Sequence, residues 1–255
     1  MKKLIAVLLA TALLLCAFVC ADEDLLAKVQ EKGKLIVASE GCWVPWTYID
    51  DDGEHAGFDL DLAREIAKKL GVEVEFVDCP WDSLFGGLES GRYDIVINGV
   101  EWTEEREEKY AFSTPYAYMR TVLIVRGDNE SITCFEDLAG KKTANTLSST
   151  YAQLGESYGA TTVGVDDLDS TMRLVIQGRV DATLNAQVSY AEYISLHPEA
   201  NVKVVAQTED ASIVGVIMRK DCTTLIDAVN AAIAELREEG VLSELSIKYF
   251  GVDVT

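Results

Sequence analysis

The stretch "LIVASEGCWVPWTYIDDDGEHAGFDLDLAREIAKKLGVEVEFV", residues 35–77, decides the fold because it alternates strand and helix. Its first residues, 35–39, form a short apolar run before Gly41, which is typical of a buried strand. Asp59 is placed to cap a helix that Gly71 ends, and residues 72–77 are rich in β-formers. The apolar residues of that helix recur at helical spacing, namely Ala63, Ile66, Ala67 and Leu70.

The same alternation continues along the chain. Asp82 is placed to cap a short helix that ends near Gly91, and residues 93–98 form the next strand. Later strands are predicted at residues 143–146, 161–165, 180–184 and 202–205, and later helices at residues 149–157, 169–177, 188–196 and 225–236. Two such series predict an α/β fold with two lobes, each a mostly parallel sheet flanked by helices.

The composition and the N-terminal residues limit the class of protein. The chain has 255 residues and a formal net charge of -21, which argues against a nucleic-acid partner. A basic start, an apolar core and a small residue at Ala21 predict a signal peptide over residues 1–21. We therefore expect export to the periplasm or the cell exterior. Acylation of Cys16 or Cys20 leaves a lipid-anchored form open.

Open parallel sheets bind ligands outside the carboxyl ends of their strands. All 4 tryptophans of the chain follow predicted strands, at Trp43, Trp46, Trp81 and Trp102. Core packing explains a single tryptophan, but not the clustering of the whole set. We therefore predict that Trp43 and Trp81 line a cleft.

Arg106 and the pair Ser149-Thr150 point to a carboxylate ligand. A guanidinium binds a carboxylate through two parallel N–H bonds, and the free N–H groups of a helix N-terminus attract the same group. Arg106 could instead pair with neighbouring glutamates, and Ser149 could be only a helix cap. Together with an aromatic wall and nearby acids, these residues favour a ligand that has both a carboxylate and an ammonium, which is an amino acid.

Several stretches resemble the extracytoplasmic solute-binding proteins of family 3, which bind polar amino acids for ABC importers. They are "GKLIVASEGCWVPWTYIDDDGEHAGFDLDLAREIAKKLG", "WDSLFGGLESGRYDIVINGVEWTEER", "FSTPY", "DLAGKK", "GRVDATLN" and "LREEGVLSELSIKYFG". The resemblance covers residues 33–250. It implies a hinged protein with lobe 1 at residues 33–117 plus 214–255 and lobe 2 at residues 120–211, joined by two strands.

The resemblance also implies roles for single residues. Arg106 should clamp the α-carboxylate with help from Thr150, and Trp43 should stack on the ligand with Trp81 as a second wall. The full predicted ligand-binding set is Glu40, Trp43, Trp81, Asn98, Gly99, Glu101, Arg106, Thr146, Ser149, Thr150 and Asn185.

Three positions depart from the family pattern. Ala186 stands where an acid usually holds the α-ammonium, and Glu101 stands where Ser or Thr is usual. Our hypothesis is that Glu101, with Glu40 nearby, has taken over the ammonium contact. Ser148 replaces a glycine before the Ser-Thr pair.

The cysteines suggest a disulfide rather than a metal site. The chain has 2 histidines and no CxxC spacing, so no metal site is predicted. Cys42 and Cys79 follow strands that should be neighbours, which makes a disulfide beside the site possible. A Cys134–Cys222 bridge would tie the two lobes together and is not expected.

These observations favour a binding protein that delivers a polar or cationic L-amino acid to a membrane permease. A dehydratase-like enzyme on the same fold and a ligand-sensing module remain alternatives. An enzyme needs a positioned acid or base, and no His or Lys falls at a predicted strand end, so we expect no enzyme and no cofactor. Arginine, lysine or histidine are the leading ligands, ahead of cystine or glutamine, and we expect a monomer.

Overall fold

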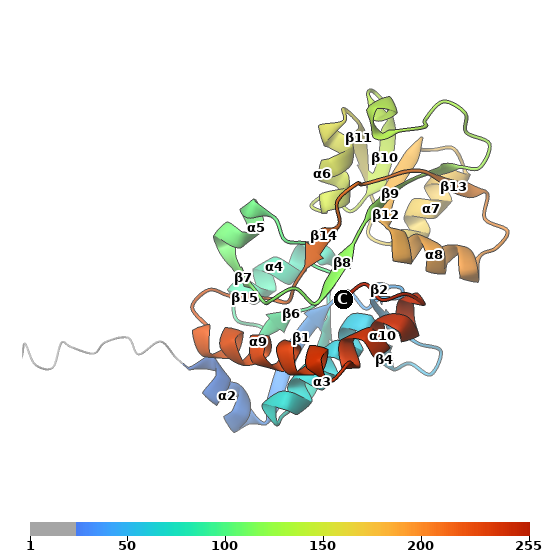
Figure 1. Ribbon diagram of the computed structural model, residues 1–255. Helices are drawn as coiled ribbons and strands as arrows, with labels where there is room; N and C mark the ends of the chain where they lie inside the picture. Colours follow the sequence, from blue (N-terminus) through green and yellow to red (C-terminus); the bar gives the residue numbers. More distant parts are fainter. Residues whose placement is uncertain (1–23) are drawn as a thin grey trace, which may run out of the picture.

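The structure is a computed structural model that describes residues 24–255, so the predicted signal peptide lies outside the described residues. Figure 1 shows two α/β lobes joined by two strands that lie side by side. The two-lobed α/β fold predicted from the sequence is confirmed. Within residues 24–255, no helix has the length and apolar character that a membrane span requires.

Lobe 1 is built on a five-stranded sheet of order β5-β1-β6-β15-β7. Its strands are β1 (Lys34–Ser39), β5 (Glu73–Asp78), β6 (Ile95–Val96), β7 (Tyr110–Phe112) and β15 (Ile217–Arg219). Its helices are α2 (Leu25–Lys32), α3 (Phe58–Leu70), α4 (Trp81–Glu89), α5 (Glu104–Lys109), α9 (Thr223–Glu238) and α10 (Val241–Phe250). A small sheet lies beside them, with β2 (Cys42–Trp43), β3 (Thr47–Ile49) and β4 (His55–Ala56).

The side chains of β1 alternate between two apolar layers, as expected for a strand buried on both faces. Leu35 and Val37 are buried in the cluster that α3 and α9 complete, whereas Ala38 is buried in the cluster against α4. Each large apolar side chain buried in this way contributes about 1.5–3 kcal/mol to stability. Both faces of the lobe 1 sheet are therefore covered.

Lobe 2 has the same layered plan, with strand order β11-β10-β12-β9-β13. Its strands are β9 (Thr121–Arg126), β10 (Lys142–Asn145), β11 (Thr161–Gly164), β12 (Ala182–Ala186) and β13 (Val202–Gln207). Its helices are η1 (Phe135–Leu138), α6 (Thr150–Ser157), α7 (Leu168–Ile176) and α8 (Gln187–Leu196). β10 pairs in parallel with β11 and β12, but β9 runs antiparallel to β12 and β13.

Two antiparallel strands connect the lobes, β8 (Ala117–Met119) and β14 (Ser212–Val214). The chain enters lobe 2 through β8 and returns through β14 (Figure 1). Glu101 forms an isolated bridge with Val214, and the Trp102 N–H donates to the Ile213 carbonyl over 2.8 Å. The segment that follows β6 is therefore bonded directly to the crossover strand β14.

Two predicted helix caps are wrong. Helix α3 begins at Phe58 with Gly57 as its cap, and the fully buried Asp59 carboxylate instead accepts the Gly99 N–H over 2.5 Å. Only glycine fits at position 57, because a Cβ there would lie 2.2 Å from the carbonyl oxygen of Trp46. Helix α4 begins after Pro80, and the Asp82 carboxylate accepts a hydrogen bond from lobe 2 rather than capping α4.

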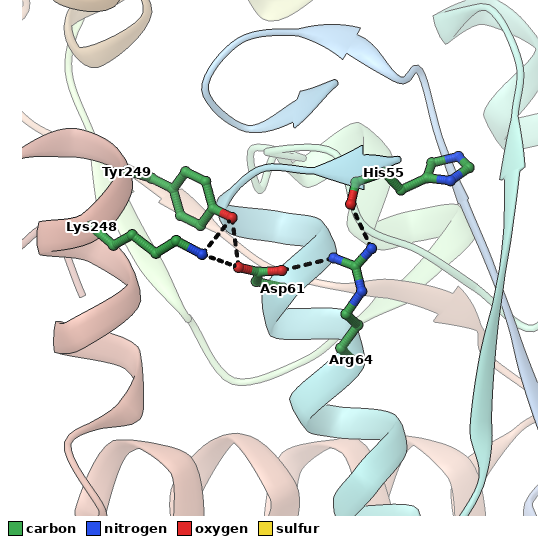
Figure 2. A network of polar contacts seen from close by, with 5 residues as sticks. All are labelled: His55, Asp61, Arg64, Lys248 and Tyr249. Carbon is green, nitrogen blue, oxygen red and sulfur yellow. Dashed lines mark hydrogen bonds and ion pairs between the residues drawn. The ribbon is translucent and has the colours of Figure 1, made fainter. Parts of the chain in front are cut away.

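Figure 2 shows a polar network that fastens α10 to α3. The Asp61 carboxylate accepts hydrogen bonds from Lys248 Nζ over 2.7 Å and from the Tyr249 hydroxyl over 2.5 Å. It also binds Arg64 Nη1 over 2.7 Å, and Arg64 Nη2 donates to the His55 carbonyl over 2.5 Å. One carboxylate thus joins α10 to α3, and through Arg64 it is also linked to β4 of the small sheet.

Replacing Asp61 with asparagine should lower the free energy of unfolding by about 1–2 kcal/mol at pH 7, because charged hydrogen bonds are lost at a partly exposed site. Despite some desolvation, the Lys248 and Tyr249 hydrogen bonds hold the pKa of Asp61 below its usual value. The stabilisation is therefore present above the ordinary aspartate pKa and disappears as the pH falls through the lowered pKa. Urea unfolding of both proteins at pH 7 and pH 3 measures this difference.

The matched control is Glu65→Gln on the same helix, where the carboxylate pairs only with the exposed Lys68. It should change the free energy of unfolding by less than about 0.5 kcal/mol. Equal stability of Asp61→Asn and Glu65→Gln at pH 7 would show that the network does not fasten α10.

Candidate functional site

A cleft between the lobes lies at the carboxyl ends of the strands, as the topology predicts. It encloses about 610 Å³ of space between protein atoms, counting the solvent at its mouth. Its lining residues are Glu40, Cys42, Trp43, Trp81, Gly99, Glu101, Arg106, Asn145, Thr146, Ser149, Thr150, Tyr151, Asp166, Asp167, Leu168, Thr171 and Asn185.

Arg106 supplies the cationic end of the cleft. Its backbone N–H is capped by the Thr103 hydroxyl at the start of α5, and its side chain is only 9% exposed. Nη1 donates to the Glu101 carbonyl over 2.9 Å. The guanidinium lies 5.2 Å from the ring centroid of Trp81 and 5.5 Å from that of Phe85. Burial lowers the pKa of Arg106, which means that its charge is poorly solvated and favours an anionic partner.

Trp43 forms the aromatic wall of the cleft. Its ring stacks on the fully buried Trp46 at a centroid distance of 5.3 Å, and its Nε1–H donates to Asn185 Oδ1 in lobe 2 over 3.3 Å. Gly99 has a φ of 55°, and a Cβ there would lie 2.5 Å from the Trp43 ring. Only glycine therefore fits at position 99, against the Trp43 ring.

Glu101 and Glu40 are acids with unusual surroundings. Glu101 is 5% exposed, and its Oε1 has no hydrogen-bond partner among residues 24–255. Burial raises the pKa of Glu101, although Thr150 and the Arg106 charge oppose the rise. Burial also raises the pKa of Glu40 to about 7, and the charges of Asp82 and Asp166 act in the same direction. Both carboxyl groups would be stabilised in their ionised form by a cationic ligand.

Asn98 is the one predicted ligand-binding residue that does not line the cleft. Its Nδ2 donates to Glu40 Oε2 over 2.7 Å, while its Oδ1 accepts the Glu40 N–H over 2.8 Å and the Thr47 hydroxyl over 3.1 Å. A buried amide satisfied in this way positions Glu40. A direct contact between Asn98 and a ligand stays a prediction.

Ser149 shows that the predicted helix cap is real. Its hydroxyl accepts the Ala152 N–H over 3.1 Å and donates to the Thr146 carbonyl over 2.6 Å. These bonds occupy the Ser149 hydroxyl at the start of α6, whereas the side chain of the neighbouring Thr150 hydrogen-bonds the Glu101 carboxyl. Both residues line the cleft.

The possible disulfide between Cys42 and Cys79 is wrong, because both residues are free thiols. Cys42 lies on β2 and lines the cleft, whereas Cys79 Sγ lies 3.9 Å from the Tyr93 hydroxyl on the side of α4. The strands that precede the two cysteines, β1 and β5, are neighbours. The two sulfur atoms are nevertheless not bonded, because Cys42 lines the cleft and Cys79 contacts Tyr93. Cys134 and Cys222 are also free.

Sequence reasoning missed several lining residues. Asp166 and Asp167 come one residue after the end of β11, so the strand-end rule that selected Glu40 would have found them. Asp167 caps α7 by accepting the Ser170 N–H over 2.7 Å. The other missed residues are Asn145, Tyr151, Leu168 and Thr171. In the part of the chain that the structure describes, no group of His, Cys, Asp and Glu could hold a metal ion.

The charged residues that line the cleft are mostly acidic. Arg106 is the only lysine or arginine that lines it within residues 24–255, whereas Glu40, Asp166 and Asp167 lie among its other lining residues. A site with one buried cation and several carboxylates matches a ligand with one carboxylate and more than one positive group.

Comparison with known proteins agrees with this geometry. The chain is 38% identical over 235 residues to the L-cystine-binding protein TcyA of Bacillus subtilis, covering 92% of this chain and 87% of the relative. An ancestral arginine-binding protein bound to arginine has 35% identity and a TM-score of 0.81, covering 86% of this chain and 98% of that chain. An ancestral amino-acid-binding protein, a precursor of cyclohexadienyl dehydratase, has 32% identity and a TM-score of 0.81, covering 88% of this chain and 99% of that chain.

The model of one protein family matches residues 35–252, nearly all of the described chain. The sequence motifs, the two-lobed fold and the cleft agree with that match. The relative in Bacillus subtilis is named as a binding protein. The chain belongs to the bacterial extracellular solute-binding proteins, family 3, and acts as the amino-acid-binding component of an ABC importer.

Proposed function

We propose that the chain binds an L-amino acid that carries a second positive group and presents it to the importer's permease. The observation that carries the proposal is the charge of the cleft, with one buried guanidinium and the carboxylates of Glu40, Asp166 and Asp167. Arginine and lysine carry the second positive group on the side chain, and cystine carries it as a second ammonium. The names of the relatives include both arginine and cystine.

Each part of such a ligand has a partner in the cleft. Arg106 and Thr150 take the α-carboxylate, and Glu101 takes the α-ammonium in place of the acid absent at Ala186. The side chain packs against Trp43 and Trp81, which gain cation–π attraction from a positive group. In this proposal, lobe 1 (residues 33–117 plus 214–255) and lobe 2 (residues 120–211) close on the ligand about β8 and β14.

We also propose that the protein is a monomeric binding protein rather than an enzyme or a sensor module, and that it is exported by the signal peptide at residues 1–21. An enzyme would need a positioned acid or base. Glu40 is the best candidate because of its raised pKa. However, no histidine or lysine lines the cleft in the described residues to complete a proton-transfer pair.

The testing experiment is a thermal-shift panel of amino acids on protein that has been unfolded and refolded to remove copurified ligand. A ligand at about a thousand times its Kd adds about 4 kcal/mol to the free energy of unfolding. Arginine, lysine or cystine should raise the Tm by several degrees, and glutamate should not. A rise in Tm with glutamine alone would contradict the proposal that the ligand carries a second positive group. A Tm that no amino acid raises would contradict amino-acid binding.

Replacing Glu101 with glutamine should weaken binding by about tenfold or more, since a hydrogen bond to a charged group contributes about 1.5–3 kcal/mol. Isothermal titration calorimetry with L-arginine and with L-cystine measures the change. Glu107→Gln is the control, because Glu107 lies exposed on α5, outside the cleft. An affinity of Glu101→Gln equal to that of Glu107→Gln would remove Glu101 from the ammonium contact.

A further inference from the structure

Ser148 contacts lobe 1 at two atoms, although it belongs to lobe 2. It lies in the turn between β10 and α6. Its hydroxyl donates to the Asp82 carboxylate at the start of α4, and its carbonyl accepts Arg106 Nη2 over 3.5 Å. We propose that Ser148 and Asp82 form a latch that holds the lobes closed and sets how long a bound ligand stays.

The latch lies outside the cleft, because neither Ser148 nor Asp82 lines it. The hydrogen bond across the cleft from Trp43 to Asn185, in contrast, joins two residues that do line it. Removal of the latch therefore changes closure without removing a ligand contact. That separation distinguishes the latch from the binding residues.

Arg106 couples the latch to the ligand, and this step rests on the proposed carboxylate contact. The guanidinium contacts lobe 1 through the Glu101 carbonyl and lobe 2 through the Ser148 carbonyl. A ligand carboxylate bound to the Arg106 guanidinium fixes the plane of the guanidinium. In that orientation Nη2 stays directed at the Ser148 carbonyl. Ligand binding and closure then favour each other, as linkage requires.

A hydrogen bond that forms only in the closed state slows opening and hence dissociation, with little effect on association. Ser148→Ala and Asp82→Ala should each increase the dissociation rate about threefold to tenfold, the range expected for one partly exposed hydrogen bond to a charged acceptor. The double variant should show little further increase, because both changes remove the same bond.

The experiment is stopped-flow tryptophan fluorescence with L-arginine and, in parallel, L-cystine as probes. Ser157→Ala is the matched control, since Ser157 lies at the far end of α6 and donates only to the Leu154 carbonyl. It should dissociate at the wild-type rate. Wild-type dissociation rates in both Ser148→Ala and Asp82→Ala would overturn the latch.

A second measurement separates the latch from the proposed function. If the wild-type protein binds neither these probes nor lysine, the ligand proposal fails, and small-angle scattering of ligand-free protein still tests the latch. The radius of gyration of Ser148→Ala and Asp82→Ala should then exceed that of the wild type and of Ser157→Ala. Equal radii would overturn the latch in that case.

Discussion

Replacing Arg106 with alanine should weaken amino-acid binding by about a hundredfold to ten-thousandfold, the largest effect that we expect from one substitution. Two parallel hydrogen bonds from a guanidinium to the α-carboxylate contribute about 1.5–3 kcal/mol each. Arg106 itself is only 9% exposed, so water replaces the lost bonds poorly. Isothermal titration calorimetry with L-arginine and L-cystine measures the loss.

The fold should survive this change. Burial lowers the pKa of Arg106, so the charge itself opposes folding. The Tm of ligand-free Arg106→Ala should lie close to that of the wild type. Arg173→Ala is the control, because Arg173 is exposed on α7 and should leave affinity unchanged. An Arg106→Ala protein that binds as tightly as Arg173→Ala would refute the carboxylate clamp.

The affinity for a cationic amino acid should fall about tenfold for each pH unit below 7, reaching about a hundredfold between pH 8 and pH 5. The reason is Glu40, whose pKa is raised to about 7 in the ligand-free cleft. A positive group beside Glu40 favours its ionised form, so binding at low pH first requires loss of a proton. Titration calorimetry in two buffers that differ in ionisation enthalpy should show proton release at pH 6 and none at pH 8.

The control for this dependence is Glu40→Gln. It should bind more weakly than the wild type at pH 8 but lose most of the pH dependence between pH 5 and 8. A wild-type affinity that stays constant over this range would exclude Glu40 as a partner of the positive group. Glutamine as ligand should show no such dependence, since its side chain is neutral.

The same raised pKa has the opposite consequence for ligand-free stability. The folded protein keeps protons on Glu40 and on Asp59, whose pKa burial also raises to about 7, when the unfolded chain has already lost them. The stability of the ligand-free protein should therefore decrease as pH rises from about 4.5 to 7. Ligand should offset this loss at Glu40 but not at Asp59.

The strand-end rule located most of the cleft from the sequence alone. Glu40 and Trp43 follow β1, Trp81 follows β5 and Arg106 follows β6, and the parallel pairing of β1 with β5 and β6 brings them to one opening. Glu40, Trp43 and Trp81 each lie shortly after a recognisable apolar run, and Arg106 is the one arginine among the glutamates that follow the next run.

Other features depend on contacts that local patterns do not encode. Strands β8 and β14 are short, and all of lobe 2 lies between them in the sequence, so neither periodicity nor length identifies them as a pair. Asn98 was expected in the cleft because of its position, but its amide is satisfied by Glu40 and Thr47. Asp59 has the sequence position of a helix cap, but its carboxylate is buried in the core, where it accepts the Gly99 N–H.

The place of β15 in lobe 1 has a consequence for the order in which the chain can fold. β15 (Ile217–Arg219) lies between β6 and β7, although it follows all of lobe 2 in sequence. As the chain leaves a ribosome or a translocation pore, lobe 2 has all its strands once residue 207 has emerged. Lobe 1 must wait for β15, α9 and α10, with Leu35 and Val37 exposed in the meantime. The first half of the chain to be made is thus the last to finish folding, and this is the interval in which a holding chaperone would bind it.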